Sequence, residues 1–134
     1  MADGIFKTFD ITTSGLRAQW KRMQVVANNV ANADTTRTPE GGPYQRKHVV
    51  FSTVLNQLAG VKVEGVVADG EPPKRVYSPG HPEADAEGYL AMPNVMVPVE
   101  MVDLTTASRA YEANLLAMRN FRKICEETIK LLKS

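Results

Sequence analysis

The stretch VPVEMVDLTTASRAYEANLLAMRNFRKICEETIKLLKS, residues 97–134, decides the fold of this 134-residue chain. After Pro98 it contains neither proline nor glycine, the residues that most often interrupt a helix. At a 3.5-residue spacing nine of eleven positions are apolar, against 43% hydrophobic residues in the whole chain. The eleven seam positions are Val97, Met101, Leu104, Ser108, Tyr111, Leu115, Met118, Arg122, Cys125, Ile129 and Leu132. This pattern predicts one long helix with a coiled-coil seam.

Residues 1–33 carry a second pattern of the same kind. They contain no proline and only two glycines, Gly4 and Gly15. Seven of nine positions at the same spacing are apolar, and the nine are Ile5, Phe9, Thr12, Leu16, Gln19, Met23, Val26, Val30 and Ala33. The pattern predicts a second long helix at the start of the chain.

Both predicted helices need partners along their length. At 1.5 Å per residue the helix over 97–134 is roughly 50 Å long, so a small domain cannot bury its whole seam. A second apolar strip lies away from the two seams, at Trp20, Ala27, Ala107, Ala110, Ala113 and Ala117. Two strips on one helix indicate packing against more than one neighbour, and this is the first sign of assembly.

The middle of the chain, residues 34–96, has a different composition. It holds seven of the eight prolines and seven of the nine glycines. Short segments at 44–51, 61–67, 74–77 and 88–92 are candidate strands, of which we expect two or three to form short hairpins. The predicted fold is mainly α with a small β-rich insert, and its terminal helices pair as an antiparallel coiled coil. Residues 1–33 and 97–134 would form one discontinuous helical assembly domain, with 34–96 as the insert.

Charge and composition exclude several classes of protein. Sixteen basic and 15 acidic residues give a net charge of +1, which excludes the broad basic surface of a dedicated nucleic-acid binder. A single cysteine excludes an internal disulfide, and the apolar runs are too short for a transmembrane helix. The first twenty residues lack a continuous apolar segment, so we expect no cleavable signal peptide and an export route that does not need one.

Few residues carry the chemistry of a catalytic or metal site. His81, Glu83 and Asp85 lie within five residues, but a metal site needs three or four converging ligands, so a solvated turn is the favoured interpretation. Cys125 lies on a seam and is interpreted as a structural thiol. A reactive thiol stays open because Arg122 and Lys123 are nearby. We expect no catalytic residue, no metal and no cofactor. A small metal-dependent hydrolase using His81 and Asp85 is the enzymatic alternative.

Three asparagines cluster where the first helix should end, at Asn28, Asn29 and Asn32. Asparagine is unfavourable inside a helix but common at its end, where its amide caps backbone groups. A polar amide between two helices can also fix their register. The two interpretations are compatible, and the sequence does not separate them.

Several motifs resemble flagellar basal-body rod proteins. They are FDI at 9–11, SGL at 14–16, AQ at 18–19, RM at 22–23 and ANNVANADTTRTPEGGPY at 27–44. The extension TRTPEGGPY is narrower and is similar to rod protein C, a type of proximal-rod subunit. Later blocks agree with that type: VYSPGHP at 76–82, GYLAMPNV at 88–95, EMVD at 100–103 and ASRAYEAN at 107–114.

The resemblance implies a structural subunit and no enzyme. Such a protein is exported unfolded by the flagellar type III export apparatus and packs into a hollow helical rod that transmits torque across the periplasm and cell wall. Implied partners are other rod proteins, the rod-base adaptor and copies of the chain itself, with no nucleic acid and no small-molecule substrate. The expected interface residues are Leu16, Met23, Val26, Asn28, Asn29, Asn32, Glu40, Tyr44, Met101, Leu104, Arg109, Tyr111, Glu112, Asn114, Leu115 and Met118.

The loop at 38–44 is the best candidate for telling neighbouring rod proteins apart. Its prolines restrict the backbone, and Glu40 and Tyr44 offer a charge and an aromatic side chain. The alternative to a rod subunit is a soluble coiled-coil adaptor that binds one partner helix in a groove. An adaptor should form a small closed oligomer, whereas a rod subunit adds head to tail without closing.

Overall fold

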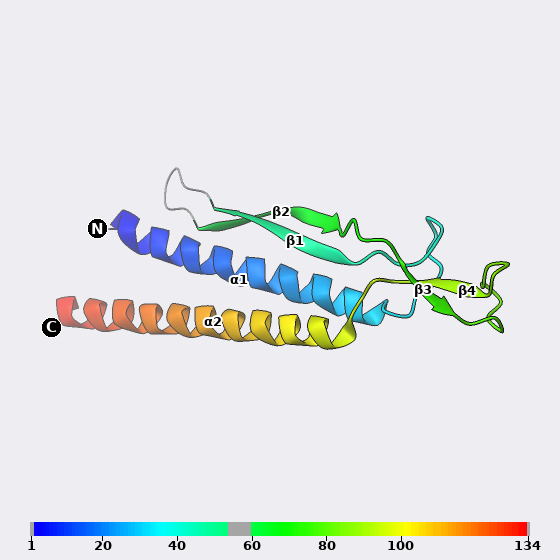
Figure 1. Ribbon diagram of the computed structural model, residues 1–134. Helices are drawn as coiled ribbons and strands as arrows, with labels where there is room; N and C mark the ends of the chain where they lie inside the picture. The colour runs from blue at the N-terminus through cyan, green and yellow to red at the C-terminus, as the bar shows by residue number, and fades with distance from the viewer. Residues whose placement is uncertain (1, 54–59, 134) are drawn as a thin grey trace.

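The computed structural model describes residues 2–53 and 60–133 and contains two long helices with two hairpins between them (Figure 1). Helix α1 covers Ala2–Ala31 and helix α2 covers Val97–Lys133. The strands are β1 (Lys47–Thr53), β2 (Val61–Ala68), β3 (Lys74–Tyr77) and β4 (Tyr89–Met92). All four candidate segments therefore form strands, more than the two or three that the sequence led us to expect. Residues 1 and 134, the outermost residues of the two predicted helical segments, lie outside the described part of the chain.

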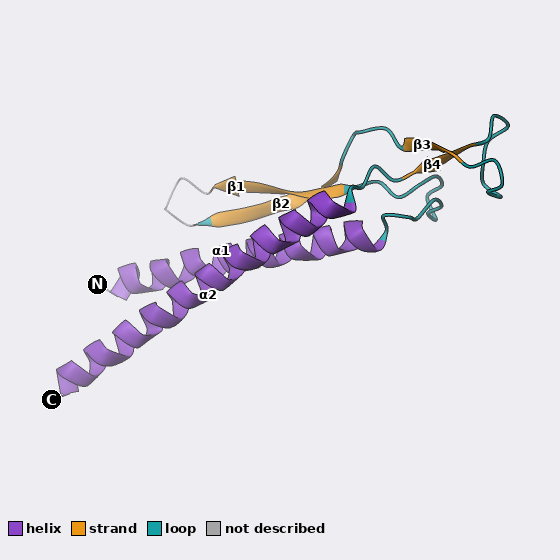
Figure 2. Cartoon of the chain, turned by 60° about the horizontal axis from the view of Figure 1, so that its bottom comes forward, coloured by secondary structure: helices purple, strands orange, loops and turns teal. Residues whose placement is uncertain are grey.

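The two helices lie side by side and run in opposite directions (Figures 1 and 2). The ring centroids of Phe9 and Phe121 are 6.2 Å apart, and those of Trp20 and Tyr111 are 6.3 Å apart. From Phe9 to Trp20 the residue number rises along α1, whereas from Phe121 to Tyr111 it falls along α2. The two helices are therefore antiparallel. Ala107 has no exposed surface, so α2 comes close to its neighbour at this point.

The β1–β2 hairpin packs on α1, on a different side from α2 (Figure 2). The two strands are antiparallel, with Lys47 opposite Ala68 and an irregularity between Val50 and Phe51. Ala18 and Val25 of α1 are buried in this region. The backbone N–H of Val61 donates to Ser14 Oγ at 3.0 Å. The core is therefore thin and is built on α1, which contacts both other layers.

A close approach to α1 explains the glycine that precedes β2. Gly60 has φ of 90°, a conformation that side chains disfavour. A Cβ at Gly60 would overlap the hydroxyl of Ser14 and contact the backbone of Ile11. This position therefore fixes how closely the hairpin sits on the helix.

The β3–β4 hairpin projects beyond the end of α1, away from both chain termini (Figure 1). Its strands pair in register, with Tyr77 opposite Tyr89, and the two rings meet edge to face at 5.3 Å. At the other end of the molecule the two helices diverge toward their free ends (Figure 2). Phe6 there is 68% exposed and Leu132 is 83% exposed. Neither described helix is both long and apolar enough to cross a membrane.

Candidate functional site

Asn29 is the centre of a buried polar junction near the end of α1. Its side chain has no exposed surface, and its amide makes four hydrogen bonds. Nδ2 donates to the carbonyl of Lys47 at 2.8 Å and to Glu100 Oε2 at 3.0 Å. Oδ1 accepts from the backbone N–H of Lys47 and from the Tyr44 hydroxyl, both at 3.0 Å. All four hydrogen-bonding positions of the amide are used, so Asn29 ties α1 to both β1 and α2.

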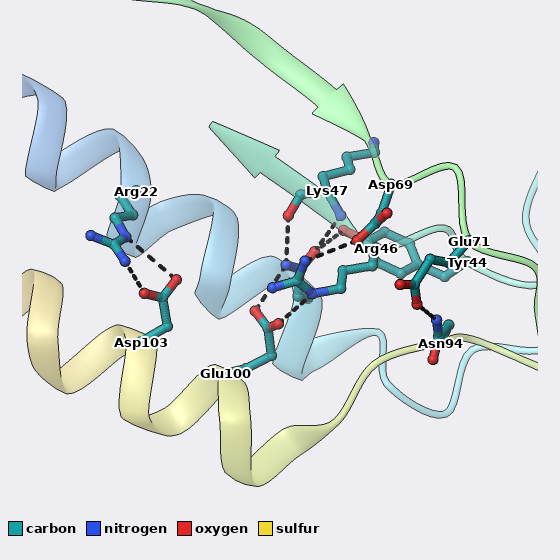
Figure 3. Close-up of polar contacts among 10 residues, drawn as sticks. Arg22, Tyr44, Arg46, Lys47, Asp69, Glu71, Asn94, Glu100 and Asp103 are labelled. Atoms are coloured by element: carbon teal, nitrogen blue, oxygen red, sulfur yellow. Dashed lines mark hydrogen bonds and ion pairs between the residues drawn. The ribbon is translucent and has the colours of Figure 1, made fainter. Parts of the chain in front are cut away.

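Glu100 brings α2 into this junction from its first turn. It is 1% exposed, and its Oε1 accepts from Arg46 Nε at 2.6 Å (Figure 3). Arg46 also donates through Nη1 to Asp69 Oδ2 at 3.0 Å, just after β2. A buried carboxylate is tolerated when it is paired and hydrogen-bonded, and both oxygens of Glu100 meet that condition. The polar junction, defined here as Asn29, Tyr44, Arg46, Asp69 and Glu100, thus joins both helices and the β1–β2 hairpin.

The electrostatics of the junction follow from this pairing. Burial lowers the pKa of Arg46, but the hydrogen bonds and charges of Glu100 and Asp69 outweigh it and leave the pKa above its ordinary value. Burial raises the pKa of Tyr44 above 10.0, and the negative charge of Glu100 raises it further. Arg46 therefore stays charged and Tyr44 stays protonated over the physiological range, as the hydrogen bonds require.

A second polar contact joins the two helices next to the junction. Arg22 of α1 is paired with Asp103 of α2, and both side chains are half-buried (Figure 3). Asp103 is three residues after Glu100, so it lies on the same face of α2. The junction and this ion pair together fix how α1 and α2 meet.

These polar groups pair with one another across the elements that they join. Asn29 uses all four positions of its amide within the chain, and Glu100 uses both of its carboxylate oxygens. Within residues 2–53 and 60–133, no three His, Cys, Asp or Glu side chains are grouped to hold a metal ion. The Nδ1 of His81 accepts locally, from the backbone N–H of Glu83 at 3.2 Å. Cys125 is a free, half-buried thiol on α2. The arrangement can position structural elements.

The structure divides the predicted interface residues into two groups. Eleven are buried or half-buried within the single chain: Leu16, Met23, Val26, Asn29, Asn32, Tyr44, Leu104, Tyr111, Asn114, Leu115 and Met118. Five are exposed: Asn28, Glu40, Met101, Arg109 and Glu112. The first group serves the packing of this chain on itself, which leaves the second group free for other contacts.

Two predicted roles of the asparagines are filled by different residues. Asn32 Nδ2 donates to the carbonyl of Asn28 at 2.8 Å, and its Oδ1 accepts from the Thr35 hydroxyl at 3.2 Å, so Asn32 caps the helix end. Asn29 instead bridges the two helices through Glu100. Sequence reasoning missed the roles of Arg46, Asp69 and Glu100. The sequence signal that could have pointed to the junction was Glu100, an acidic residue in the first turn of a helix with many apolar residues.

Two models of known protein families match the two helical parts of this chain. The family model described as "Flagella basal body rod protein" matches residues 9–37, which cover most of α1 and its cap. The model described as "Flagellar basal body rod FlgEFG protein C-terminal" matches residues 86–131, from the start of the β4 region through most of α2. The matched segments are the ones that supply Asn29 and Glu100. Arg46 and Asp69 lie between them.

Relatives align over nearly the whole chain. The flagellar basal-body rod protein FlgC of Salmonella typhimurium is 44% identical over 130 residues, covering 95% of this chain and 97% of the relative. The FlgC proteins of Bacillus subtilis and Borreliella burgdorferi are 39% and 35% identical, covering 96% and 97% of this chain and 98% and 99% of their own lengths. These relatives are named as rod components and not as enzymes. The chain therefore belongs to the flagellar basal-body rod protein family.

Proposed function

We propose that this structural rod subunit builds the proximal part of the flagellar rod, where α1 and α2 pack as a coiled coil with those of neighbouring subunits. The resulting hollow helical shaft transmits torque across the periplasm and cell wall. The partners are copies of this chain, other rod proteins and the rod-base adaptor. The chain reaches them through the flagellar type III export apparatus.

Exposed apolar side chains on both helices are the observation that carries the proposal. On α1, Phe6 and Trp20 are exposed, and on α2 so are Val102, Leu116 and Ile124. Single exposed apolar residues are ordinary, but a series along both helices of the pair marks a surface that another protein covers. A rod subunit surrounded by neighbours supplies that cover.

The structure also bears on which part of the chain selects its neighbours. The loop at 38–43 closes on itself, because the Thr38 N–H donates to the Gly42 carbonyl at 2.9 Å and the Gly41 N–H donates to the Thr38 carbonyl at 3.0 Å. Glu40 is exposed in this loop. Tyr44 is half-buried, and its hydroxyl donates to Asn29, so its polar end serves the junction. We therefore assign the loop's contribution to specificity to Glu40 and the shape of the turn.

Imaging of basal bodies tests the function. We expect a bacterium that lacks its own copy of the chain to be non-motile, and the tagged chain to restore motility and appear in purified rods. A tagged chain that restores motility but is absent from the rod would contradict the proposal. A small closed oligomer bound to a soluble partner would favour the coiled-coil adaptor instead.

Deletion of residues 38–43 tests the specificity loop. The ends of the deletion lie close together, since the Tyr44 N–H donates to the Thr35 carbonyl at 2.9 Å. We expect the variant to be exported and to fail to join the rod at its position. A glycine–serine segment of equal length is the control for loop closure and should fail equally. Loss of export would place the secretion signal in the loop, and normal rods would make the loop dispensable.

A further inference from the structure

The β1–β2 hairpin is fastened to α1 unequally at its two ends (Figure 1). At one end, inside the polar junction, the Asn29 amide makes two hydrogen bonds with the backbone of Lys47. At the other end, among the described residues, a single hydrogen bond reaches α1, from the Val61 N–H to Ser14 Oγ at 3.0 Å. The hairpin is therefore fixed at the junction and held by little at its Ser14 end.

The packing between the hairpin and α1 is incomplete. Every residue of β1 and β2 is half-buried or exposed. A cavity of about 310 Å³ lies between β1 and the helix pair, and one of about 460 Å³ lies between β2 and α1. Gln19 lines a further hollow beside Phe51, and its Oε1 is buried with no hydrogen-bond partner among the described residues. Voids and an unpaired buried acceptor both weaken an interface, so the hairpin can separate from α1 without the rest of the fold opening.

The hairpin covers a stripe of α1 that has the spacing of a helix-packing surface. Ile11, Ala18 and Val25, here called the covered stripe, are seven residues apart and therefore share one face of the helix. Ala18 and Val25 are buried, and the backbone of Ile11 lies against Gly60, where the hairpin reaches α1. Apolar side chains at this spacing interlock with those of another helix, whereas the hairpin leaves cavities along them. The covered stripe thus suits a helix better than it suits its present cover.

We propose that the β1–β2 hairpin is a strap, closed over α1 in the free subunit, that lifts at its Ser14 end when a helix of a neighbouring rod subunit packs on the covered stripe. The polar junction is the pivot, because it holds Lys47 in place while the Ser14 end moves. A neighbour opens the strap only if it binds the open form more tightly than the closed one. The free chain therefore keeps this face of α1 covered until it reaches its place. The proposal rests on the proposed rod function and adds a change of shape on incorporation.

Thiol labelling of the purified full-length chain tests whether the strap lifts. In a Cys125→Ser background, Ala18→Cys puts a thiol beneath the strap, and the control Ala107→Cys puts one on α2 at a position with no exposed surface. We expect a maleimide to label position 18 about tenfold faster than position 107, because the strap opens locally. Ser14→Ala removes the hydrogen bond from Val61 and should raise the rate about fivefold at position 18 alone. Equal rates at the two positions, or no effect of Ser14→Ala, would overturn the proposal.

A disulfide across the strap tests whether lifting is needed for incorporation. A Cβ at Gly60 would lie 3.2 Å from Ser14 Cβ, which a small shift brings within the about 3.5–4.5 Å of a disulfide. We expect a chain with Ser14→Cys, Gly60→Cys and Cys125→Ser, once oxidised, to stay out of rods, and a reductant to restore its incorporation. The reduced chain is the matched control, since it carries the same substitutions without the bond. Oxidised chains that enter normal rods would overturn the proposal and leave the rod function intact, whereas absence of the unmodified chain from rods would count against the function itself.

Discussion

The two ends of the α1–α2 pair are held in different ways. At one end, Asn29 and Glu100 are fully buried and hydrogen-bonded in the polar junction. At the other end, Phe9 and Phe121 make the last ring contact before the helices diverge, and Ile124 and Leu132 beyond it are exposed. The polar end is complete within one chain. The apolar end needs neighbours to bury its side chains.

This difference separates folding from assembly. A buried polar group costs free energy unless its partners are in place, so the junction forms only with α1, α2 and β1 in one arrangement. Exposed apolar side chains impose no such geometry and gain from any neighbour that covers them. We infer that the junction sets the shape of the subunit, while the open end and the helix faces drive its incorporation.

The largest effect on stability should come from Glu100→Ala. The substitution leaves Arg46 and the Nδ2 of Asn29 without their shared acceptor, and breaking a buried pair in this way costs about 3–5 kcal/mol. Urea unfolding followed by far-UV circular dichroism would measure the loss. Glu112→Ala, exposed on the same helix, is the control and should change the unfolding free energy by no more than about 0.5 kcal/mol. Equal effects of the two variants would show that the junction does not hold the fold.

A charge in the middle of the pair should have the next largest effect. Leu115 is half-buried, one turn along α2 from Tyr111, which contacts Trp20. We expect Leu115→Asp to destabilise the pair by about 1–3 kcal/mol and to abolish motility while the subunit is still made and exported. Cells that carry the conservative substitution Leu115→Met should swim normally. Normal rods with Leu115→Asp would mean that neither the helix pair nor a neighbouring subunit depends on this face of α2.

Removing one hydroxyl from the junction should have a smaller effect. Tyr44→Phe loses the hydrogen bond to Asn29 and should cost about 1 kcal/mol at neutral pH. Because burial, and then Glu100, raise the pKa of Tyr44 above 10.0, its contribution is fully present below that pH and is lost as the pH rises through the higher folded-state value. Urea unfolding should therefore show a shallower alkaline decline for Tyr44→Phe. Tyr77→Phe, at an exposed ring, should keep the full decline, and an identical decline in all three chains would contradict this role.

The smallest effect on the isolated chain should come from the open end. Phe121→Ala removes the contact with Phe9, but helix ends that open locally contribute little to global stability, so the loss should be about 0.5 kcal/mol or less. Motility should fall all the same, because the ring is needed where neighbours pack. Phe121→Leu should retain most of the motility. If Phe121→Ala lowered the free energy of unfolding as much as Glu100→Ala, the two ends of the helix pair would not differ in the way proposed.

Periodicity was enough to predict the elements of this fold. An apolar spacing of 3.5 residues located both helices, and short segments between turn signals in the proline- and glycine-rich middle located the four strands. We expected fewer strands than the four observed, because short segments alternate only weakly between apolar and polar residues. Pairing with a neighbouring segment decides which of them form strands. The coiled-coil geometry of the helix pair stays a prediction. Met101 illustrates the limit of a fixed spacing, since it falls on the counted seam and is exposed in the chain.

The junction could not be predicted in the same way. Its residues come from α1, the segment just before β1, the position just after β2, and α2. No local pattern in one sequence links Asn29 with Arg46, Asp69 and Glu100. The capping role of Asn32 was predictable because its contacts are local. Polar contacts between distant segments depend on how the whole chain packs, so only the structure reveals them.

Amide hydrogen exchange along the isolated full-length chain tests the difference between the two ends most directly. We expect strong protection around the junction, in residues 22–31 of α1 and 100–111 of α2, and little protection in residues 4–9 and 122–133. In assembled rods the weakly protected segments should become protected as neighbours cover them. Uniform protection along both helices of the monomer, or exchange fastest at the junction, would contradict the account.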